Sequence, residues 1–563
     1  MVDGTPLPPA VDDVVEMVVV DDSHTLPDMF TLRFRDPQHE VLALAGLKLG
    51  ATVQIFAGSV GEPATTSLII GEVTALEAEL DETGTHVVAR GYDLMHRLQR
   101  GLHTRSFVDT TEAEIVRAIA DDAGIEIAEI TDTSDPIPFV TQANQTNLEF
   151  LRARGRESGF DVAVRDGKLF FQPPTDSSTA PGPGTLTSGT PLQLLYGKDL
   201  NAFMPRITAA EQVAEVEVRG WDPDQQQTVV ASAKASTTSV DVGDLSPSSV
   251  ADLFGSGRYV VDDRPLSDAS EVQRVADSVA EQIGSAFAEA DGIADGNPLL
   301  RAGTAINVSG VGHPFEGQYT ITATRHVIGA RGYRTHFTVS GRQERSLLGL
   351  ASQGDTSGDA SAGGEPIHGV VIGIVTDSND PSQSGRVKLK FPWLADDYES
   401  DWARMVAPGA GGDRGIVFLP EPNDEVLVAF ERGDVRSPFV LGALWNANSK
   451  PPRADALNSG GAVAQRVIQS RAGHHVVFSD DPSNGGISIL TGDGNHAINI
   501  LVNDEKIQIV SSGAIEITAG TTLTLKGESV TISGGTVEID ADESLTAKSG
   551  GVTSVKGEML MLN

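Results

Sequence analysis

The chain has 563 residues, no cysteine and a formal net charge of −37 at pH 7. The lack of cysteine excludes disulfides, thiolate metal sites and thiol nucleophiles, and the negative charge disfavours binding to phosphate backbones or anionic lipid surfaces. Its 60 glycines beside 4 tryptophans are typical of turn-rich β structure spread over several domains. Residues 1–10 are polar and proline-rich. We therefore expect synthesis and folding in the cytoplasm without a signal peptide.

The first part of the chain, up to about Phe171, mixes strand-like runs with two helices. Capping boxes predict where these helices begin, and glycines predict where they end: Thr111 with Glu114 and Gly124, and Thr146 with Glu149 and Gly159. A strand over 160–164 and a hairpin at Asp166–Gly167 follow. This order of strand, helix, helix and strand predicts an α+β region.

A second β-rich module should follow a Pro/Gly/Ser/Thr-rich break, with the boundary near 173–200. Between residues 267 and 290, one apolar set keeps helical spacing and should pack on a sheet: Val272, Val275, Ala276, Val279, Ile283 and Phe287. Strands are expected again over 305–340. Residues 351–366 contain few large apolar side chains and are predicted to be a flexible linker that ends a hub domain at 1–350.

Residues 367–450 are predicted to form a small closed barrel of the oligonucleotide-fold type. Strand-like runs recur at 369–375, 386–391, 425–430 and 439–444. Three tryptophans lie in this region, Trp393, Trp402 and Trp445. They suit a base-stacking platform, but in so acidic a chain we favour packing inside the barrel or against the hub.

The last hundred residues are a ladder of short alternating segments. Apolar/polar/apolar triplets start at 507, 515, 523, 530 and 537, and their apolar members are Ile507, Ile509, Ile515, Ile517, Leu523, Leu525, Val530, Ile532, Val537 and Ile539. The alternation predicts β-strands, with glycine- and serine-rich turns between them. An open stack of such short strands would leave its edges unpaired. Residues 451–563 are therefore predicted to be a β-prism, a triple-stranded β-helix whose core these ten residues form in a homotrimer.

Short motifs in the barrel region resemble the VgrG-like spike proteins of contractile injection systems, which are related to phage baseplate hub and central-spike proteins. They are Asp380–Pro381, Gly385–Val387, Phe391–Trp393, Trp402–Arg404, Ala410–Gly411, Gly415, Asn423–Val428, Phe430, Gly433–Asp434 and Pro438. Further pieces resemble the hub and the start of the prism: Tyr92–Leu94, Asn144–Thr146, Glu157–Phe160, Phe315–Tyr319, Ser470–His475 and Val477–Asp481. The resemblance implies a mainly β protein with an α+β hub of two β-barrel-like modules, an oligonucleotide-fold barrel and a trimeric needle.

The same resemblance implies a mechanical function. Three copies would join a tail tube to a needle and pierce a target envelope, in contact with tube protein and baseplate subunits, and would act in a particle that is extracellular or fired from a bacterial cell. Met559, Leu560, Met561 and Leu562 would offer an apolar end for a PAAR-type tip protein. No nucleic acid is expected as a partner.

No catalytic, cofactor or metal site is predicted. The chain lacks a Gly-x-Ser-x-Gly elbow, a phosphate-binding loop and a His-Glu-x-x-His pair. His474 and His475 are adjacent, but neighbouring strand residues point to opposite faces, so we favour a polar start of a strand over a metal site. The acidic pairs at 504–505 and 540–543 are expected to be solvated.

Two rival functions stay open at this point. One is a trimeric tailspike or carbohydrate-active protein, which would need acidic grooves and more than 5% aromatic residues for sugar stacking. The other is a type VI spike that carries an effector.

Overall fold

The computed structural model divides into two compact units, Met1–Ser449 and Lys450–Asn563. It describes residues 1–59, 62–82, 84–132, 136–182, 190–255, 257–262, 264–342, 366–453, 458–459, 462–559 and 561. The predicted linker lies outside these residues, apart from Pro366. None of the described helices is both long and apolar enough to cross a membrane.

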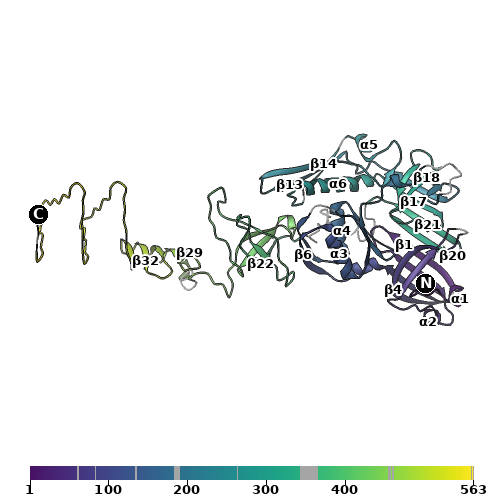
Figure 1. Ribbon diagram of the computed structural model, residues 1–563, viewed down its shortest axis with the longest axis horizontal. Helices are drawn as coiled ribbons and strands as arrows, with labels where there is room; N and C mark the ends of the chain where they lie inside the picture. Colours follow the sequence, from purple (N-terminus) through teal and green to yellow (C-terminus); the bar gives the residue numbers. More distant parts are fainter. Residues whose placement is uncertain are drawn as a thin grey trace. The chain divides into compact units, whose positions relative to one another are not determined.

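A nine-stranded sheet runs through the hub and contains strands from both its N-terminal and its C-terminal part (Figure 1). In spatial order its strands are β12 (Leu200–Ile207), β17 (Ala288–Asp295), β21 (Gly332–Val339), β20 (Ala323–Gly329), β1 (Val15–Ser23), β2 (Met29–Arg35), β5 (Gly84–Asp93), β4 (Thr66–Asp81) and β3 (Thr52–Ala57). The antiparallel pair of β1 with β20, in which Val19 lies opposite Val327, connects the two halves.

Each half of this sheet has its own buried core. One surrounds Phe30 and Phe34 and is flanked by α1 (Pro9–Asp12) and α2 (Val41–Ala45). The other surrounds Phe287 and Phe337. A four-stranded sheet covers it, composed of β11 (Gln193–Leu195), β18 (Ala305–Ser309), β19 (Gly317–Thr320) and β15 (Val240–Asp241). The prediction of two β modules is confirmed.

An α+β segment is inserted after β5. Its elements are η1 (Leu94–Gln99), β6 (His103–Thr110), α3 (Glu112–Ala123), β7 (Glu126–Ile130), β8 (Ile137–Gln145), α4 (Asn147–Ser158), β9 (Asp161–Arg165) and β10 (Lys168–Gln172), followed by η2 (Ser177–Thr179). Both predicted capping boxes are present, and Gly124 and Gly159 end the helices with φ of 63° and 73°. Asp166 and Gly167 both have positive φ, as a two-residue hairpin of type I′ requires.

The long helix α6 (Ala269–Ser285) packs one apolar face on a three-stranded sheet, as predicted. The sheet consists of β14 (Gln227–Lys234), β13 (Glu215–Asp222) and β16 (Arg258–Val261), and the short helix α5 (Pro247–Asp252) precedes β16. The predicted helix was too long. The chain turns after Ser285, so Phe287 enters the core that it shares with Phe337 instead of the helix face.

Five strands form the small barrel, in the order β23 (Lys388–Lys390), β22 (Val370–Asp377), β25 (Glu425–Phe430), β26 (Pro438–Ala443) and β24 (Arg404–Met405), with η3 (Glu431–Gly433) after β25. A bridge between Val387 and Ala403 connects the two ends of this order and closes the barrel. Its core is centred on Phe391, which stacks on Tyr398 and meets Phe430 edge-on.

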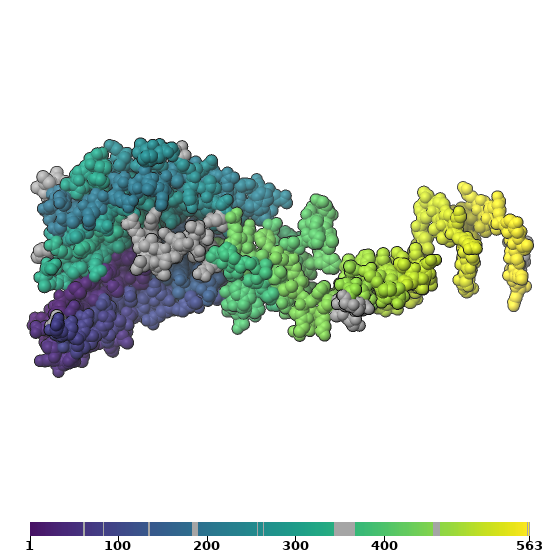
Figure 2. Space-filling model, turned by 180° about the vertical axis from the view of Figure 1, so that it is seen from behind, coloured from purple at the N-terminus to yellow at the C-terminus, as the bar shows by residue number. Residues whose placement is uncertain are grey.

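The second unit contains a short hairpin and a five-stranded antiparallel meander. The strands are β27 (Asn458–Ser459), β28 (Ala462–Val463), β29 (Gln465–Gln469), β30 (His475–Ser479), β31 (Gly486–Leu490), β32 (His496–Leu501) and β33 (Lys506–Ser511). The described residues after Ser511 form no helix and no strand within the chain. Figure 2 shows this stretch, in yellow, as a thin chain with no second layer packed on it.

Candidate assembly site

The meander in the second unit exposes an apolar face. Cross-strand register places two rows of residues on it: Arg466, Phe478, Ile487, Ile500 and Ile507, and Ile468, Val476, Ile489, Ile498 and Ile509. Every position except Arg466 is apolar, and the isoleucines and Phe478 are exposed. Arg466 forms an ion pair with Asp480 at the margin of the sheet. An exposed apolar face of this extent indicates an interface.

Two of the predicted needle-core residues, Ile507 and Ile509, lie on this face in β33. The other eight, Ile515, Ile517, Leu523, Leu525, Val530, Ile532, Val537 and Ile539, follow it and are all exposed in a single chain. In a single chain these triplets form no strands, because strand backbone needs a hydrogen-bonding neighbour along its length. That they pair as strands between three copies stays a prediction.

The larger part of the apolar face was not predicted from the sequence. The same apolar/polar/apolar triplet occurs at Ile487–Ser488–Ile489 and Ile498–Asn499–Ile500, in β31 and β32. The triplets at 487, 498 and 507 start 11 and 9 residues apart, so a search for a period of 7 or 8 residues does not find the first two. The isoleucine pairs themselves were the available signal.

Of the four predicted tip residues, the structure describes two. Met559 and Met561 are both strongly exposed, whereas Leu560 and Leu562 lie outside the described residues. The end of the described chain therefore presents thioether side chains to solvent, which suit an adaptable apolar contact.

The two adjacent histidines make different local contacts. The Nδ1–H of His475 donates to the carbonyl of Gly473 at 2.8 Å, and Nδ1 of His474 accepts from the backbone N–H of Gly492 at 3.1 Å. Among the residues that the structure describes, no three His, Asp or Glu side chains are grouped so that they could hold a metal ion.

The tryptophans of the barrel region do not lie where they were expected. Trp393 is 47% exposed and Trp445 is 71% exposed, so neither packs inside the barrel or against the hub. Trp393 lies three residues after β23 and Trp445 lies two residues after β26. Trp402 is half-buried, with the Lys388 ammonium 5.6 Å from its ring centroid.

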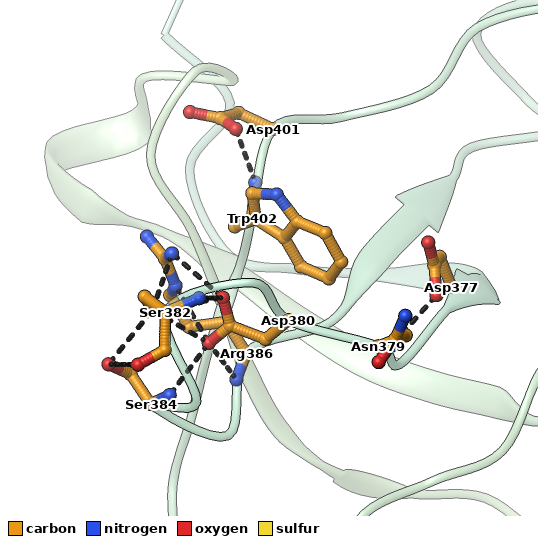
Figure 3. Close-up of polar contacts among 8 residues, drawn as sticks. All are labelled: Asp377, Asn379, Asp380, Ser382, Ser384, Arg386, Asp401 and Trp402. Carbon is orange, nitrogen blue, oxygen red and sulfur yellow. Dashed lines mark hydrogen bonds and ion pairs between the residues drawn. The ribbon is translucent and has the colours of Figure 1, made fainter.

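A carboxylate organises the turn after β22 (Figure 3). Asp380 accepts from the backbone N–H groups of Ser382 and Ser384, at 3.1 and 2.9 Å, and from the guanidinium of Arg386 at 2.8 Å. The Arg386 hydrogen bond lowers the pKa of Asp380 well below its usual range. This arrangement uses the Asp-Pro and Gly-Arg-Val motifs of the barrel to fix a turn.

A buried row of alternating charges joins the barrel to the hub within the first unit. Arg436 of the barrel lies 2.7 Å from Asp434 and 3.6 Å from Glu157 of α4. Glu157 also pairs with Arg154, which pairs with the buried Glu112 of α3. The Arg436–Glu157 pair connects the barrel to the hub, and each of these two residues keeps a second partner on its own side, Asp434 and Arg154.

A second buried polar cluster lies between the two hub modules. Asp22 contacts Arg301 and the backbone N–H of Ala302. Burial, together with nearby Asp22, raises the pKa of Asp28 well above its usual value. Burial lowers the pKa of His326, whose ring hydrogen-bonds Tyr333 at 2.8 Å, to about 4. Asp22 and His326 belong to β1 and β20, the paired strands that connect the two modules.

Three domain families match successive parts of the chain. The Alg8 N-terminal domain matches residues 37–330, which is more than half of the chain. The type VI secretion system/phage-baseplate injector OB domain matches residues 371–445, and the phage baseplate V C-terminal trimerisation domain matches residues 465–542.

Two relatives from Pseudomonas aeruginosa match short parts of the chain. The type VI secretion system spike protein VgrG5 is 31% identical over 125 residues, which are 19% of this chain and 16% of the relative. The spike protein VgrG2a is 33% identical over 88 residues, which are 15% of this chain and 10% of the relative. The chain thus spans less than a fifth of either relative.

A solved structure of a Francisella PdpA–VgrG complex matches much more of the chain. The match covers 88% of this chain and 83% of the solved chain, with a TM-score of 0.51 and 10% identity. At that identity it shows a shared fold.

Proposed function

Since the chain belongs to the family of the Alg8 N-terminal domain and is VgrG-like in its order of hub, barrel and trimerisation domain, we propose that three copies form the hub and spike of a contractile injection system. The observation that carries this proposal is the exposed apolar face of β29–β33, which lies within the region matched by the trimerisation domain. A single copy leaves this face uncovered.

Trimerisation would cover the apolar face and pair the strand edges that one copy leaves exposed. Around a common axis, the apolar face and the alternating residues up to Ile539 turn inward, and each short strand pairs with strands of the neighbouring copies. Every edge is then paired, and the result is a stiff prism with few loops. The needle then transmits force without catalysis, and the protein is not an enzyme.

The buried charges between α4 and the barrel suit this mechanical function. Arg436, Glu157 and Arg154 connect the barrel to the α+β part of the hub by ion pairs. A thrust delivered to the hub would pass through this joint to the barrel. The hub would receive the thrust from tube protein and baseplate subunits.

Met559 and Met561 would be covered by a PAAR-type tip protein. The particle would be assembled inside a bacterium and would act outside it or be fired from it, piercing the target envelope mechanically. The match to two type VI spike proteins favours a type VI secretion system as the setting of this function.

Mass measurement in native buffer tests the central claim. The purified chain should have the mass of three copies, and its second unit should resist protease as long as the copies stay together. A well-folded single copy with a protease-resistant second unit would refute the proposal. Cleavage of peptidoglycan or capsular glycans by the purified protein would instead support the rival carbohydrate-active function.

A further inference from the structure

One loop of the barrel exposes a row of consecutive apolar side chains. The loop runs from 406 to 422, between β24 and β25, and turns back at a bridge between Gly411 and Arg414. Its exposed apolar residues, here called the arm, are Val406, Ile416, Val417, Phe418 and Leu419. Val417 is 79% exposed and Phe418 is 63% exposed.

The arm is uncovered on both sides. Consecutive residues of an extended segment point in opposite directions, and here four in succession are exposed. The backbone is fixed at the base of the arm, where the N–H of Ile416 donates to Pro408 and the N–H of Glu421 donates to Asp424. An exposed apolar segment that is fixed at its base indicates a contact surface.

A matching surface lies on the outer wall of the same barrel. Its exposed residues, here called the receiving wall, are Val370, Ile372, Trp393, Leu441 and Trp445. Ile372 and Val370 alternate with residues that face the core, and β25 and β26 continue the wall beside them. The indole N–H of Trp393 donates to the carbonyl of Ile372 at 2.9 Å, which fixes the ring on the wall.

We propose that the arm of one barrel lies on the receiving wall of a second copy. The named residues of both surfaces are apolar, and they stay exposed in a single chain. A contact that joins two different surfaces of identical subunits is heterologous, and it closes into a ring when each copy gives one arm and receives one. Three such contacts would join the three barrels in a closed ring.

The occupant is a second copy because the chain brings copies close at this point. The match to the barrel family ends at residue 445, and the match to the trimerisation domain begins at residue 465. A connection this short raises the effective concentration of neighbouring barrels to about the millimolar range. The inference therefore rests on the proposed trimer, and it adds a contact in the barrel, which the needle does not require.

Photo-crosslinking in the full chain tests the contact. Phe418 is replaced by p-benzoyl-phenylalanine, which the exposure of Phe418 should allow without loss of folding. Irradiation should join two chains on a denaturing gel, and the linked peptides should come from the receiving wall. The matched control places the same photo-reactive residue at Leu80, which is 65% exposed on β4 of the hub and should give no product with the wall.

The absence of cysteine allows a second, independent test. A chain with both Val417→Cys and Ile372→Cys should form disulfide-linked species of up to three copies under oxidation, whereas each single variant should not. The native mass could be that of three copies while the crosslinks join arm and wall of one chain or lead elsewhere. The proposed contact between copies would then be wrong, and the trimer would stand. If the native mass is one copy, the proposed function fails as well.

Discussion

The two units of the chain bury their apolar side chains in opposite ways. In the first unit, phenylalanines such as Phe30, Phe287 and Phe391 are fully buried in separate cores. In the second unit, the isoleucines of β31 to β33 and every apolar residue of 515–539 are exposed. The first unit has the cores of a self-sufficient fold, and the second has the sequence of a subunit interface. Stability of the second unit should therefore depend on protein concentration, and that of the first should not.

A charge inside the proposed needle core should have the largest effect. Leu525→Asp would place a carboxylate from each copy at the same level of the axis, and burying unpaired like charges costs several kcal/mol. We expect loss of the three-copy mass and of protease resistance in the second unit. Thr524→Asp, on the opposite face of the same triplet, should leave both unchanged. An intact trimer in the Leu525 variant would place this residue outside the core.

The first unit should respond instead to the loss of a buried charge. Arg154→Met removes the cation that neutralises Glu112 and reaches Glu157. Leaving a buried carboxylate unpaired should lower the free energy of unfolding by about 3–5 kcal/mol. Chemical denaturation followed by a probe in the hub measures this. Arg117→Met, at an exposed position of α3, is the control and should change stability by less than about 0.5 kcal/mol.

The buried histidine of the hub should make the first unit sensitive to acid. The pKa of His326 is about 4 when folded, below the ordinary value of about 6.5, so the unfolded state takes up the proton first as the pH falls. Unfolding free energy should decrease between about pH 6.5 and pH 4, by roughly 3 kcal/mol at most.

Denaturant titrations at several pH values test this contribution. In His326→Gln the decrease across this window should be smaller, whereas His39→Gln, at an exposed position, should keep the original slope. Equal slopes in the two variants would mean that His326 does not titrate as described.

The smallest expected effect lies at a helix cap. The Thr146 hydroxyl accepts from the backbone N–H of Glu149 at 3.2 Å, and its loss in Thr146→Ala should cost about 1 kcal/mol. Thr146→Ser keeps the acceptor and should recover most of the difference in melting temperature. If serine does not recover it, the methyl group of Thr146 matters more than its cap.

The sequence predicted those features that depend on neighbouring residues. Both capping boxes, the Asp166–Gly167 hairpin and the apolar face of α6 follow from side chains a few positions apart. Long-range partners could not be predicted this way. Arg154 and Glu112 are 42 residues apart, and nothing in either helix signals that they meet.

The regular spacing in the sequence covers only part of the exposed apolar face, for a similar physical reason. Regular spacing identified Ile507 and the triplets after it, but turns of unequal length between β31, β32 and β33 conceal the same pattern. Trp393 and Trp445 were expected to be covered because their side chains are large and aromatic, yet both are exposed. Residue type alone does not say whether a side chain is covered by its own chain.

Among the described residues, the absence of strands after Ser511 also bears on how a damaged chain would affect the proposed trimer. A damaged copy would spoil the two intact copies that wind around it. In a cell that makes intact and damaged chains in equal amounts, about one-eighth of random trimers would be free of damage. A single altered gene copy would then have a dominant-negative effect on assembly of the particle.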